Sequence, residues 1–581
     1  YKYFIDKGFK DHRVFSNYGI VLKYLGKLKE AEISTRKAIE LNPDYAEAHS
    51  NLGSILIDLG NLKEAEFSTR KAIELRPDYA RAHSNLGIIL KDLGNLKEAE
   101  ISLQTAIKLN PDFAKAHCNL GSIFIDTGEF YNAINSYKKA IKSDNTLSIA
   151  KSSLIKAKGL ICDWSDQETQ LIWMDKLGIE GSWINPFSLF YYEDKPLKHL
   201  ERAKNFYKKK YYKTSKPIDK FMNKRIRIGY FSSDFRAHPT MYLISSILKL
   251  HDKSSFDIYL YSFAPEEDEY TEIAKNSGCI FKDIKELNDI ETVELVRNDK
   301  IDIAIDLMGY IIYNRMNIFS YRVAPIQINY LGYPGSLGVD TIDYILADNI
   351  IIPKENEAYY SEKIIRMPSC YQCNDNTKEI CKEPISRKDF NLPEKGFVFT
   401  CFNANKKITP REFDIWMRLL KNTKGSVLWL YQSNQYSREN LIGEAQKRNV
   451  DPSRLIFAGK LPLNKHLARH TLGDLGLDTF NYNGHTTTSD ALWAGLPVIT
   501  KIGDSFAARV SASLLTSIGL PQLITYSEKE YEEKALEIAN NPNELIILKS
   551  KLVKSREKSP LYNSELFTKE LEVKFKELIK R

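Results

Sequence analysis

The chain has 581 residues, which is enough for about three to five domains. Hydrophobic residues make up 43% and charged residues 27%, proportions that exclude a disordered or fibrous protein. The net charge of +8 is small for this length and predicts no nucleic-acid partner. No apolar run approaches the roughly 18 residues that a membrane-spanning helix needs. Seven cysteines are too few for a disulfide scaffold and favour a reducing, cytoplasmic location.

The first quarter of the chain repeats itself every 34 residues. The tripeptide Asn-Leu-Gly recurs at 51–53, 85–87 and 119–121, with a weaker copy at 17–19. Small residues return at fixed positions in each copy, and a proline closes three of the four copies. Small residues let two antiparallel helices cross closely, and proline sets the turn into the next pair. The pattern resembles the tetratricopeptide repeat, which predicts an α-solenoid over residues 1–150 with a concave binding face.

One polar column runs through the repeats for no packing reason that the sequence reveals. It consists of Asn17, Asn51, Asn85 and Asn119. One interpretation is a surface residue copied with each repeat. The other is an asparagine ladder on the concave face that binds a protein or peptide backbone through its amide donors and acceptors. Asn145 replaces the closing proline in the fourth copy, which predicts the end of the array. Because the chain begins with Tyr1 rather than Met, we expect further repeats to precede the visible ones.

The rest of the chain changes character twice. Residues 151–225 lose the periodicity and predict a helical connector. Beyond them, short β-rich runs alternate with helix-length amphipathic segments, which indicates βαβ units and parallel sheets. Five runs come first, at 226–231, 256–263, 301–306, 326–331 and 342–347. Five more follow, at 397–402, 427–431, 455–458, 474–479 and 497–500. Two doubly wound lobes, 226–380 and 381–581, therefore predict a ligand cleft at the carboxyl ends of their strands.

The strongest local motif follows the predicted strand 474–479. A small polar loop opens a helix there, and Gly484 allows a close approach of the backbone. Backbone amides and the hydroxyls of the successive threonines 486–488 are expected to point at one spot, which predicts a diphosphate site at a helix N-terminus. Ordinary N-capping by a threonine is the alternative, but capping alone does not require His485 beside three threonines.

Several motifs together resemble the protein O-linked N-acetylglucosamine transferases. They are Ser233–His238, Pro325–Gln327, Leu331–Gly335, Phe402–Pro410, Asp474–Asp478, Gly484–Asp490 and Leu492–Gly495. The resemblance covers nearly the whole chain and implies an α plus α/β fold, with a tetratricopeptide solenoid followed by a two-lobed double-Rossmann glycosyltransferase of the GT-B type. The animal enzymes carry an extra domain between the lobes, for which residues 373–396 leave no room. This chain is therefore more similar to the bacterial and SPINDLY-like branch.

The resemblance implies an inverting enzyme that moves N-acetylglucosamine from UDP-N-acetylglucosamine to Ser or Thr hydroxyls of proteins held by the repeats. Six residues would bind the nucleotide sugar: His485, Thr486 and Thr487 at the diphosphate, Asp490 at the ribose, and His466 and Arg469 at the base. Two more would be catalytic. Lys407 would neutralise the leaving diphosphate, and His238 would lie over the reacting sugar and acceptor as a base or a positioning group. The family is metal-independent, so no metal or other cofactor is expected.

Three alternatives stay open. Animal members have a lysine where this chain has Leu463, so the nucleotide base is undecided and Lys465 is a candidate substitute. Protein O-fucosylation from GDP-fucose, as in SPINDLY-like enzymes, is the other catalytic hypothesis. A non-catalytic repeat scaffold with a decayed second half is the third, although the loop 484–490 is intact. A zinc site at Cys370, Cys373 and Cys381 lacks a fourth ligand nearby.

Overall fold

A computed structural model describes residues 1–211 and 218–580. Residues 212–217 fall within the predicted connector 151–225 and, like Arg581, lie outside the described residues. The chain divides into two compact units, Tyr1–Lys158 and Gly159–Arg581. Among the described residues, no helix combines the length and the apolar character needed to cross a membrane.

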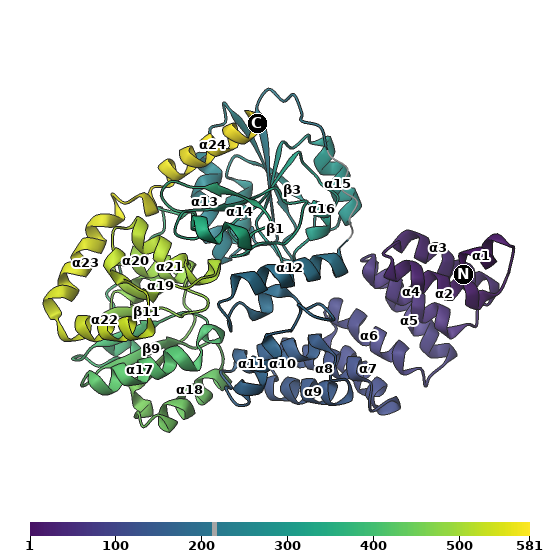
Figure 1. Cartoon of the computed structure of the whole chain (residues 1–581), viewed down its shortest axis with the longest axis horizontal. Helices are drawn as coiled ribbons and strands as arrows, with labels where there is room; N and C mark the ends of the chain where they lie inside the picture. Colours follow the sequence, from purple (N-terminus) through teal and green to yellow (C-terminus); the bar gives the residue numbers. More distant parts are fainter. Residues whose placement is uncertain (212–217, 581) are drawn as a thin grey trace. The chain divides into compact units, whose positions relative to one another are not determined.

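The first unit consists of antiparallel helix pairs (Figure 1). A short helix, α1 (Lys2–Asp6), comes first. Four pairs follow: α2 (His12–Tyr24) with α3 (Leu28–Leu41), α4 (Ala46–Asp58) with α5 (Leu62–Leu75), α6 (Ala80–Asp92) with α7 (Leu96–Leu109), and α8 (Ala114–Asp126) with α9 (Phe130–Ser143). The predicted tetratricopeptide array is therefore confirmed. The periodicity also runs one helix past its predicted end, because α10 (Ser148–Leu160) begins at the corresponding position of a further repeat.

Each pair depends on a glycine in its first helix, where the second helix crosses. A Cβ added at Gly53 would collide with the Thr69 hydroxyl and lie 3.2 Å from the Ala65 carbonyl oxygen. In the third pair, a Cβ at Gly87 would lie 2.5 Å from Leu103 Cγ. The small residues that recur in the sequence therefore mark the helix crossings, as expected for close packing.

The first lobe of the second unit contains a parallel sheet that has seven described strands, in the order β3-β2-β1-β4-β5-β6-β7. The strands are β1 (Ile226–Ser232), β2 (Phe256–Ser262), β3 (Ile280–Asp283), β4 (Ile303–Asp306), β5 (Ile326–Asn329), β6 (Tyr344–Ala347) and β7 (Lys363–Arg366). Its helices are α13 (Pro239–Leu250), α14 (Glu269–Lys275), α15 (Asp289–Asn298) and α16 (Met316–Ser320). The strand order reverses between β1 and β4, which makes the sheet doubly wound.

The second lobe repeats this plan with the described strand order β10-β9-β8-β11-β12-β13. The strands are β8 (Val398–Cys401), β9 (Val427–Tyr431), β10 (Leu455–Ala458), β11 (Leu475–Leu477), β12 (Val498–Lys501) and β13 (Ile524–Thr525). The helices are α17 (Pro410–Asn422), α18 (Gln435–Lys447), α19 (Leu463–His470), α20 (Thr486–Trp493), α21 (Val510–Ser517), α22 (Glu528–Asn540) and α23 (Pro542–Arg556). Here the order reverses between β8 and β11, so the predicted pair of Rossmann-like lobes is confirmed.

The strands that the sequence missed lie at sheet edges. All ten predicted strands are present, whereas β3, β7 and β13 were not expected. Strand β3 is only four residues long and keeps both its ends exposed, so it lacks the continuous apolar run of a central strand.

Two helical segments complete the lobes. The connector forms α11 (Gln167–Met174) and α12 (Pro196–Lys210), and Phe206 of α12 packs in a buried aromatic cluster with Tyr310 and Tyr333 of the first lobe. The last helix, α24 (Ser564–Lys580), returns from the second lobe and lies against α13 (Figure 1). There the Glu572 carboxylate accepts a hydrogen bond of 2.8 Å from the Asp252 amide.

Replacing Gly53 by Ala should lower the free energy of unfolding of the repeat array by about 1–3 kcal/mol, because the new methyl group overpacks the helix crossing. Thr69→Ala added to Gly53→Ala should restore most of that loss, since the Thr69 hydroxyl is the colliding group and has no hydrogen-bond partner among the described residues. Urea unfolding followed by circular dichroism measures both changes. Equal stability of the single and double variants would contradict the packing argument.

Candidate functional site

The predicted diphosphate loop lies at the switch point of the second sheet. Strand β8 leads into Phe402 and Asn403, and the neighbouring parallel strand β11 leads into Asp478. The two segments therefore leave the sheet side by side at its carboxyl edge. This is the edge at which doubly wound sheets bind their ligands.

The buried carboxylate of Asp478 holds the loop in place. Its Oδ1 accepts hydrogen bonds from the Gly484 amide at 2.7 Å and from Asn403 Nδ2 at 3.1 Å. Its Oδ2 accepts one from the Thr500 hydroxyl at 2.7 Å. A Cβ at Gly484 would lie 2.7 Å from Thr487 Oγ1 and 2.9 Å from Asn403 Oδ1, so only glycine fits this tightly drawn turn.

Two of the loop hydroxyls, those of Thr487 and Thr488, contact protein partners rather than one shared spot, which differs from the expectation. The Thr487 hydroxyl donates to Asn403 Oδ1, and Thr488 Oγ1 lies 2.9 Å from Ser511 Oγ. These contacts anchor the first turn of α20 instead. The first helix bond runs from the Ser489 amide to the His485 carbonyl at 3.1 Å. The amides ahead of it, in residues 486–488, are the donors that a helix N-terminus offers to an anion.

Lys407 places a cation beside this loop. It ends the 3₁₀ helix η4 (Asn405–Lys407), and its Nζ donates to the Asn483 carbonyl at 2.8 Å. The same nitrogen lies 4.3 Å from the centre of the Tyr482 ring. Burial lowers the pKa of Lys407 to about 7, and burial also lowers the pKa of the adjacent Lys406. The Lys407 amine therefore loses its proton and its charge near neutral pH.

His485 precedes α20 and stacks on the Tyr482 ring with 4.6 Å between the ring centres. Burial, followed by the charge of Lys407, holds the pKa of His485 well below its ordinary value. Its Nε2 lies 3.5 Å from the Ala507 carbonyl oxygen. The imidazole is therefore neutral and can donate one hydrogen bond without adding charge.

His466 and Arg469 lie together around the Phe402 ring. The Arg469 guanidinium carbon lies 4.4 Å from the ring centre, and its Nη1 donates to the Gly459 carbonyl at 2.6 Å. The ring centres of His466 and Phe402 are 5.6 Å apart. Burial, helped by the charge of Arg469, lowers the pKa of His466 to about 4. Asn403 follows Phe402 directly, so this aromatic cluster adjoins the diphosphate loop.

Asp490 forms an ion pair that the sequence did not indicate. Lys378 Nζ lies 2.7 Å from Asp490 Oδ1, and the two side chains are 3% and 6% exposed. Lys378 belongs to no motif, so only its position in space reveals it. Lys465, the candidate substitute for the cation missing at Leu463, pairs with Glu383 at 3.1 Å on the surface.

His238 lies in the other lobe, at the switch point of the first sheet. It follows β1 and forms the N-cap of α13. Its Nδ1 lies 3.3 Å from the Thr240 amide nitrogen and 3.2 Å from Asp234 Oδ2. A neutral ring accepts a bond from the amide, and a protonated ring pairs with the carboxylate. Burial lowers the pKa of His238 against the opposing charge of Asp234, so the neutral form is favoured.

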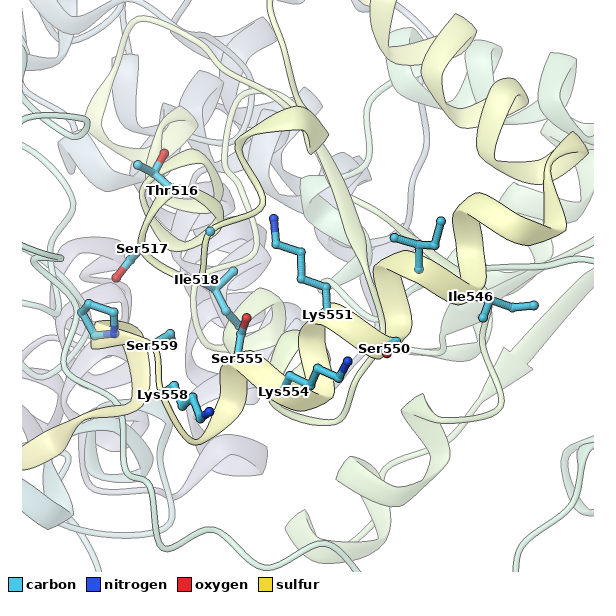
Figure 2. Close-up of a pocket in the computed structure, with 13 residues that line it drawn as sticks. Thr516, Ser517, Ile518, Ile546, Ser550, Lys551, Lys554, Ser555, Lys558 and Ser559 are labelled. Atoms are coloured by element: carbon cyan, nitrogen blue, oxygen red, sulfur yellow. The ribbon is translucent and has the colours of Figure 1, made fainter.

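A cleft of about 450 Å³ lies between the lobes. Helices α13 and α14 line one side, residues 375–379 cross it, and residues 462–464 line the other side. It adjoins the predicted site because its lining includes Lys378, the partner of Asp490. A second cavity of about 780 Å³ is lined by residues 516–519 and by residues of one side of the segment 546–560, and Figure 2 shows the lysines Lys551 and Lys554 of α23 along it. The residues predicted to bind the donor come from other segments.

The cysteine cluster does not support the zinc alternative. Cys370 and Cys373 are almost fully buried. Within residues 1–211 and 218–580, no three His, Cys, Asp or Glu side chains are grouped closely enough to hold a metal ion.

The asparagine column has a structural role that the sequence did not reveal. Asn51 Nδ2 donates to Ser16 Oγ at 2.9 Å, and Asn85 Nδ2 donates to Ser50 Oγ at 3.2 Å. Each of these asparagines thus links its helix to the first helix of the preceding repeat. Asn17 is exposed, Asn51 is buried, and Asn85 and Asn119 are half-buried. Each bond orients the amide and uses one of its two N–H groups.

Both units match known protein families. The sequence profile of glycosyl transferase family 41 matches residues 197–383 and 379–571. Profiles of the tetratricopeptide repeat match residues 12–45, 46–79, 80–113 and 114–147.

Curated plant proteins and one solved structure are similar to this chain. The probable UDP-N-acetylglucosamine–peptide N-acetylglucosaminyltransferase SEC of Arabidopsis thaliana is 35% identical over 356 residues, which are 60% of this chain and 36% of that protein. The similarly named SPINDLY protein of Oryza sativa is 31% identical over 395 residues, 66% of this chain and 42% of its own length. This chain thus spans less than half the length of either plant protein. A mutant O-GlcNAc transferase of Thermobaculum terrenum superposes with a TM-score of 0.69 at 26% identity, covering 92% of this chain and 97% of that one. Because the family profile matches more than half of its residues, the chain belongs to glycosyl transferase family 41.

Proposed function

We propose that the protein is an inverting glycosyltransferase that moves N-acetylglucosamine from UDP-N-acetylglucosamine to Ser or Thr hydroxyls of proteins bound along the repeats. The observation that supports this most strongly is the loop at the switch point of the second sheet. It combines the amides at the start of α20 with neutral His485 and with Lys407. The plant and bacterial relatives are named for this transfer.

In the proposed reaction, the acceptor oxygen attacks the anomeric carbon while the bond to the diphosphate oxygen breaks. Negative charge grows on that leaving oxygen. Lys407 and the amides of α20 are assigned to stabilise it, because preorganised positive groups act most strongly in a site that excludes water. No metal ion is assigned a part in this step.

His238 is assigned to the acceptor side of the reaction. It stands at the switch point of the first sheet, as the diphosphate loop stands at that of the second. Asp234, 3.2 Å from Nδ1, favours the charged ring and thus makes the imidazole a better proton acceptor. We assign His238 to orient the acceptor hydroxyl. It can take the proton at Nε2 only in the tautomer that carries the ring hydrogen on Nδ1, where Asp234 accepts it.

A second donor, GDP-fucose, has one observation in its favour. Animal members carry a lysine at the position of Leu463 in this chain. The nearby Lys465 forms an ion pair with Glu383. The base pocket of this chain is therefore built differently at that position. The proposed location is the cytoplasm, in line with seven cysteines that all remain free thiols.

A nucleotide panel tests the donor. UDP should raise the melting temperature, because saturation at about 100 times the Kd stabilises the folded state by about 2.7 kcal/mol. Lys407→Met and His485→Ala should each reduce the shift, whereas Lys551→Ala, which lies in the other cavity, should not. A larger shift with GDP would favour the fucosyl donor. Absence of any shift in the wild type would favour the non-catalytic scaffold.

The affinity for UDP-N-acetylglucosamine should fall as pH rises through about 7, the pKa of Lys407 without ligand. A bound diphosphate needs the protonated amine, so a pKa of about 7 predicts about 30-fold weaker binding at pH 8.5 than at pH 6. Lys407→Arg stays protonated and should flatten the profile. Lys406→Met should move the midpoint upward, because Lys406 lowers the pKa of its neighbour. Calorimetric titration measures each affinity, and a flat wild-type profile would contradict this role of Lys407.

The asparagine column is tested by separating acceptor binding from chemistry. A triple Ala variant of Asn51, Asn85 and Asn119 should lower the transfer of labelled sugar into lysate proteins by about fivefold or more, as expected when several hydrogen bonds of about 1 kcal/mol each are lost. Hydrolysis of the donor without acceptor should not change. Asn61→Ala with Asn95→Ala removes exposed asparagines from the same repeats and serves as the control. Unchanged protein labelling would show that the column only joins repeats.

A further inference from the structure

The interlobe segment, residues 374–378, makes polar contacts with both lobes. On the first-lobe side, the Asp375 carboxylate accepts a hydrogen bond of 2.9 Å from Ser245 and another from Ser246. Both serines belong to α13, the helix that His238 caps. The segment is therefore fixed to the element that places His238.

On the second-lobe side, three bonds join the interlobe segment to α20, and two more join Asn374 to Leu561 and Ser564. Asn374 Oδ1 accepts from the Ser489 hydroxyl at 2.5 Å. The Lys378 carbonyl accepts from Trp493 Nε1 at 3.2 Å, and Lys378 Nζ pairs with Asp490 Oδ1 at 2.7 Å. Ser489, Asp490 and Trp493 follow the first turn of α20. That first turn is part of the predicted diphosphate loop.

The ion pair is shielded from water on both sides. The side chains of Lys378 and Asp490 are both buried. A buried ion pair costs desolvation, and one documented reason for retaining such a pair is that it specifies a single arrangement of its groups. The pair occupies Oδ1 of Asp490 and leaves Oδ2 as the acceptor oxygen. Its geometry therefore sets the direction in which this carboxylate can accept a further hydrogen bond.

Lys378 also lines the cleft that Leu463 lines. The cleft measures about 450 Å³, and the two residues come from opposite lobes.

We propose that Lys378 is a positioning residue that sets the Asp490 carboxylate to accept a hydrogen bond from the ribose 2′-hydroxyl of the donor. This inference rests on the proposed function, which assigns Asp490 to the ribose. Lys378 holds the Asp490 carboxylate in one orientation through their 2.7 Å ion pair, so the carboxylate distinguishes a ribonucleotide from its 2′-deoxy analogue. Through Asp375, the same segment joins this recognition to the helix that His238 caps.

The test compares the affinities for UDP and 2′-deoxy-UDP, and for GDP and 2′-deoxy-GDP, by calorimetric titration of the full chain. The wild type should prefer the ribose form by about tenfold or more, the range expected for a hydrogen bond to a charged group. Lys378→Met should weaken binding of the ribose form about tenfold, as a lost charged hydrogen bond predicts, and leave the deoxy form nearly unchanged. A purely structural role would weaken both forms equally.

Four further variants complete the design. Lys378→Arg keeps the charge and should keep most of the preference, and Asp490→Asn should lose it as fully as Lys378→Met does. Lys465→Met removes a surface lysine with its own carboxylate partner and should behave like the wild type. If Lys378→Met does not fold, the double variant K378M/D490N leaves no unpaired buried charge and should fold without the preference.

Three results would overturn the inference, and they distinguish the role of Lys378 from the proposed function. A wild type that binds nucleoside diphosphates but does not prefer the ribose form, or a Lys378→Met variant that keeps the preference, would overturn the role of Lys378 alone. A wild type that binds neither UDP nor GDP would overturn the proposed function and this inference with it.

Discussion

The carboxylate of Asp478 is the constraint on which the candidate site depends. It is buried at the end of β11, and it satisfies its acceptor capacity with the Gly484 amide, Asn403 and Thr500. A buried carboxylate without hydrogen-bond partners lowers the stability of the fold. These three bonds therefore hold the loop against the end of the sheet. The loop in turn sets the start of α20. Without it, the amides at that N-terminus would have no fixed position, and Lys407 would lose the carbonyl to which it donates.

Both lobes use the same topological device. In each sheet the strand order reverses, between β1 and β4 and between β8 and β11, and the segments that leave the sheet there hold the candidate residues. His238 follows the first switch point, and Asn403 and Asp478 follow the second. The interlobe segment then ties α13 to α20. Two sites on separate sheets are thus joined by one short stretch of chain.

Local patterns were sufficient for most of the fold. The 34-residue spacing predicted the helix pairs, because a solenoid needs the same small residues at every crossing. Central strands were recognisable as apolar runs. Strands β3, β7 and β13 were missed, because an edge strand is paired on one side only and needs no continuous buried run. The loop around Gly484 was found because glycine, histidine and successive threonines follow a strand within a few residues.

What could not be predicted depends on contacts between distant segments. The loop hydroxyls were expected to face a ligand, but Thr487 and Thr488 meet Asn403 and Ser511, which the chain brings together only on folding. The asparagine column gained a packing role only when Ser16 and Ser50 were placed beside it. Lys378 stands 112 residues from its partner Asp490 and has no motif. Periodicity and motifs are local in the chain and so determined the repeats, the sheets and the diphosphate loop. The direction of each side chain and the buried ion pair at Asp490 depended on the tertiary structure, because hydrogen bonds and desolvation act between neighbours in space.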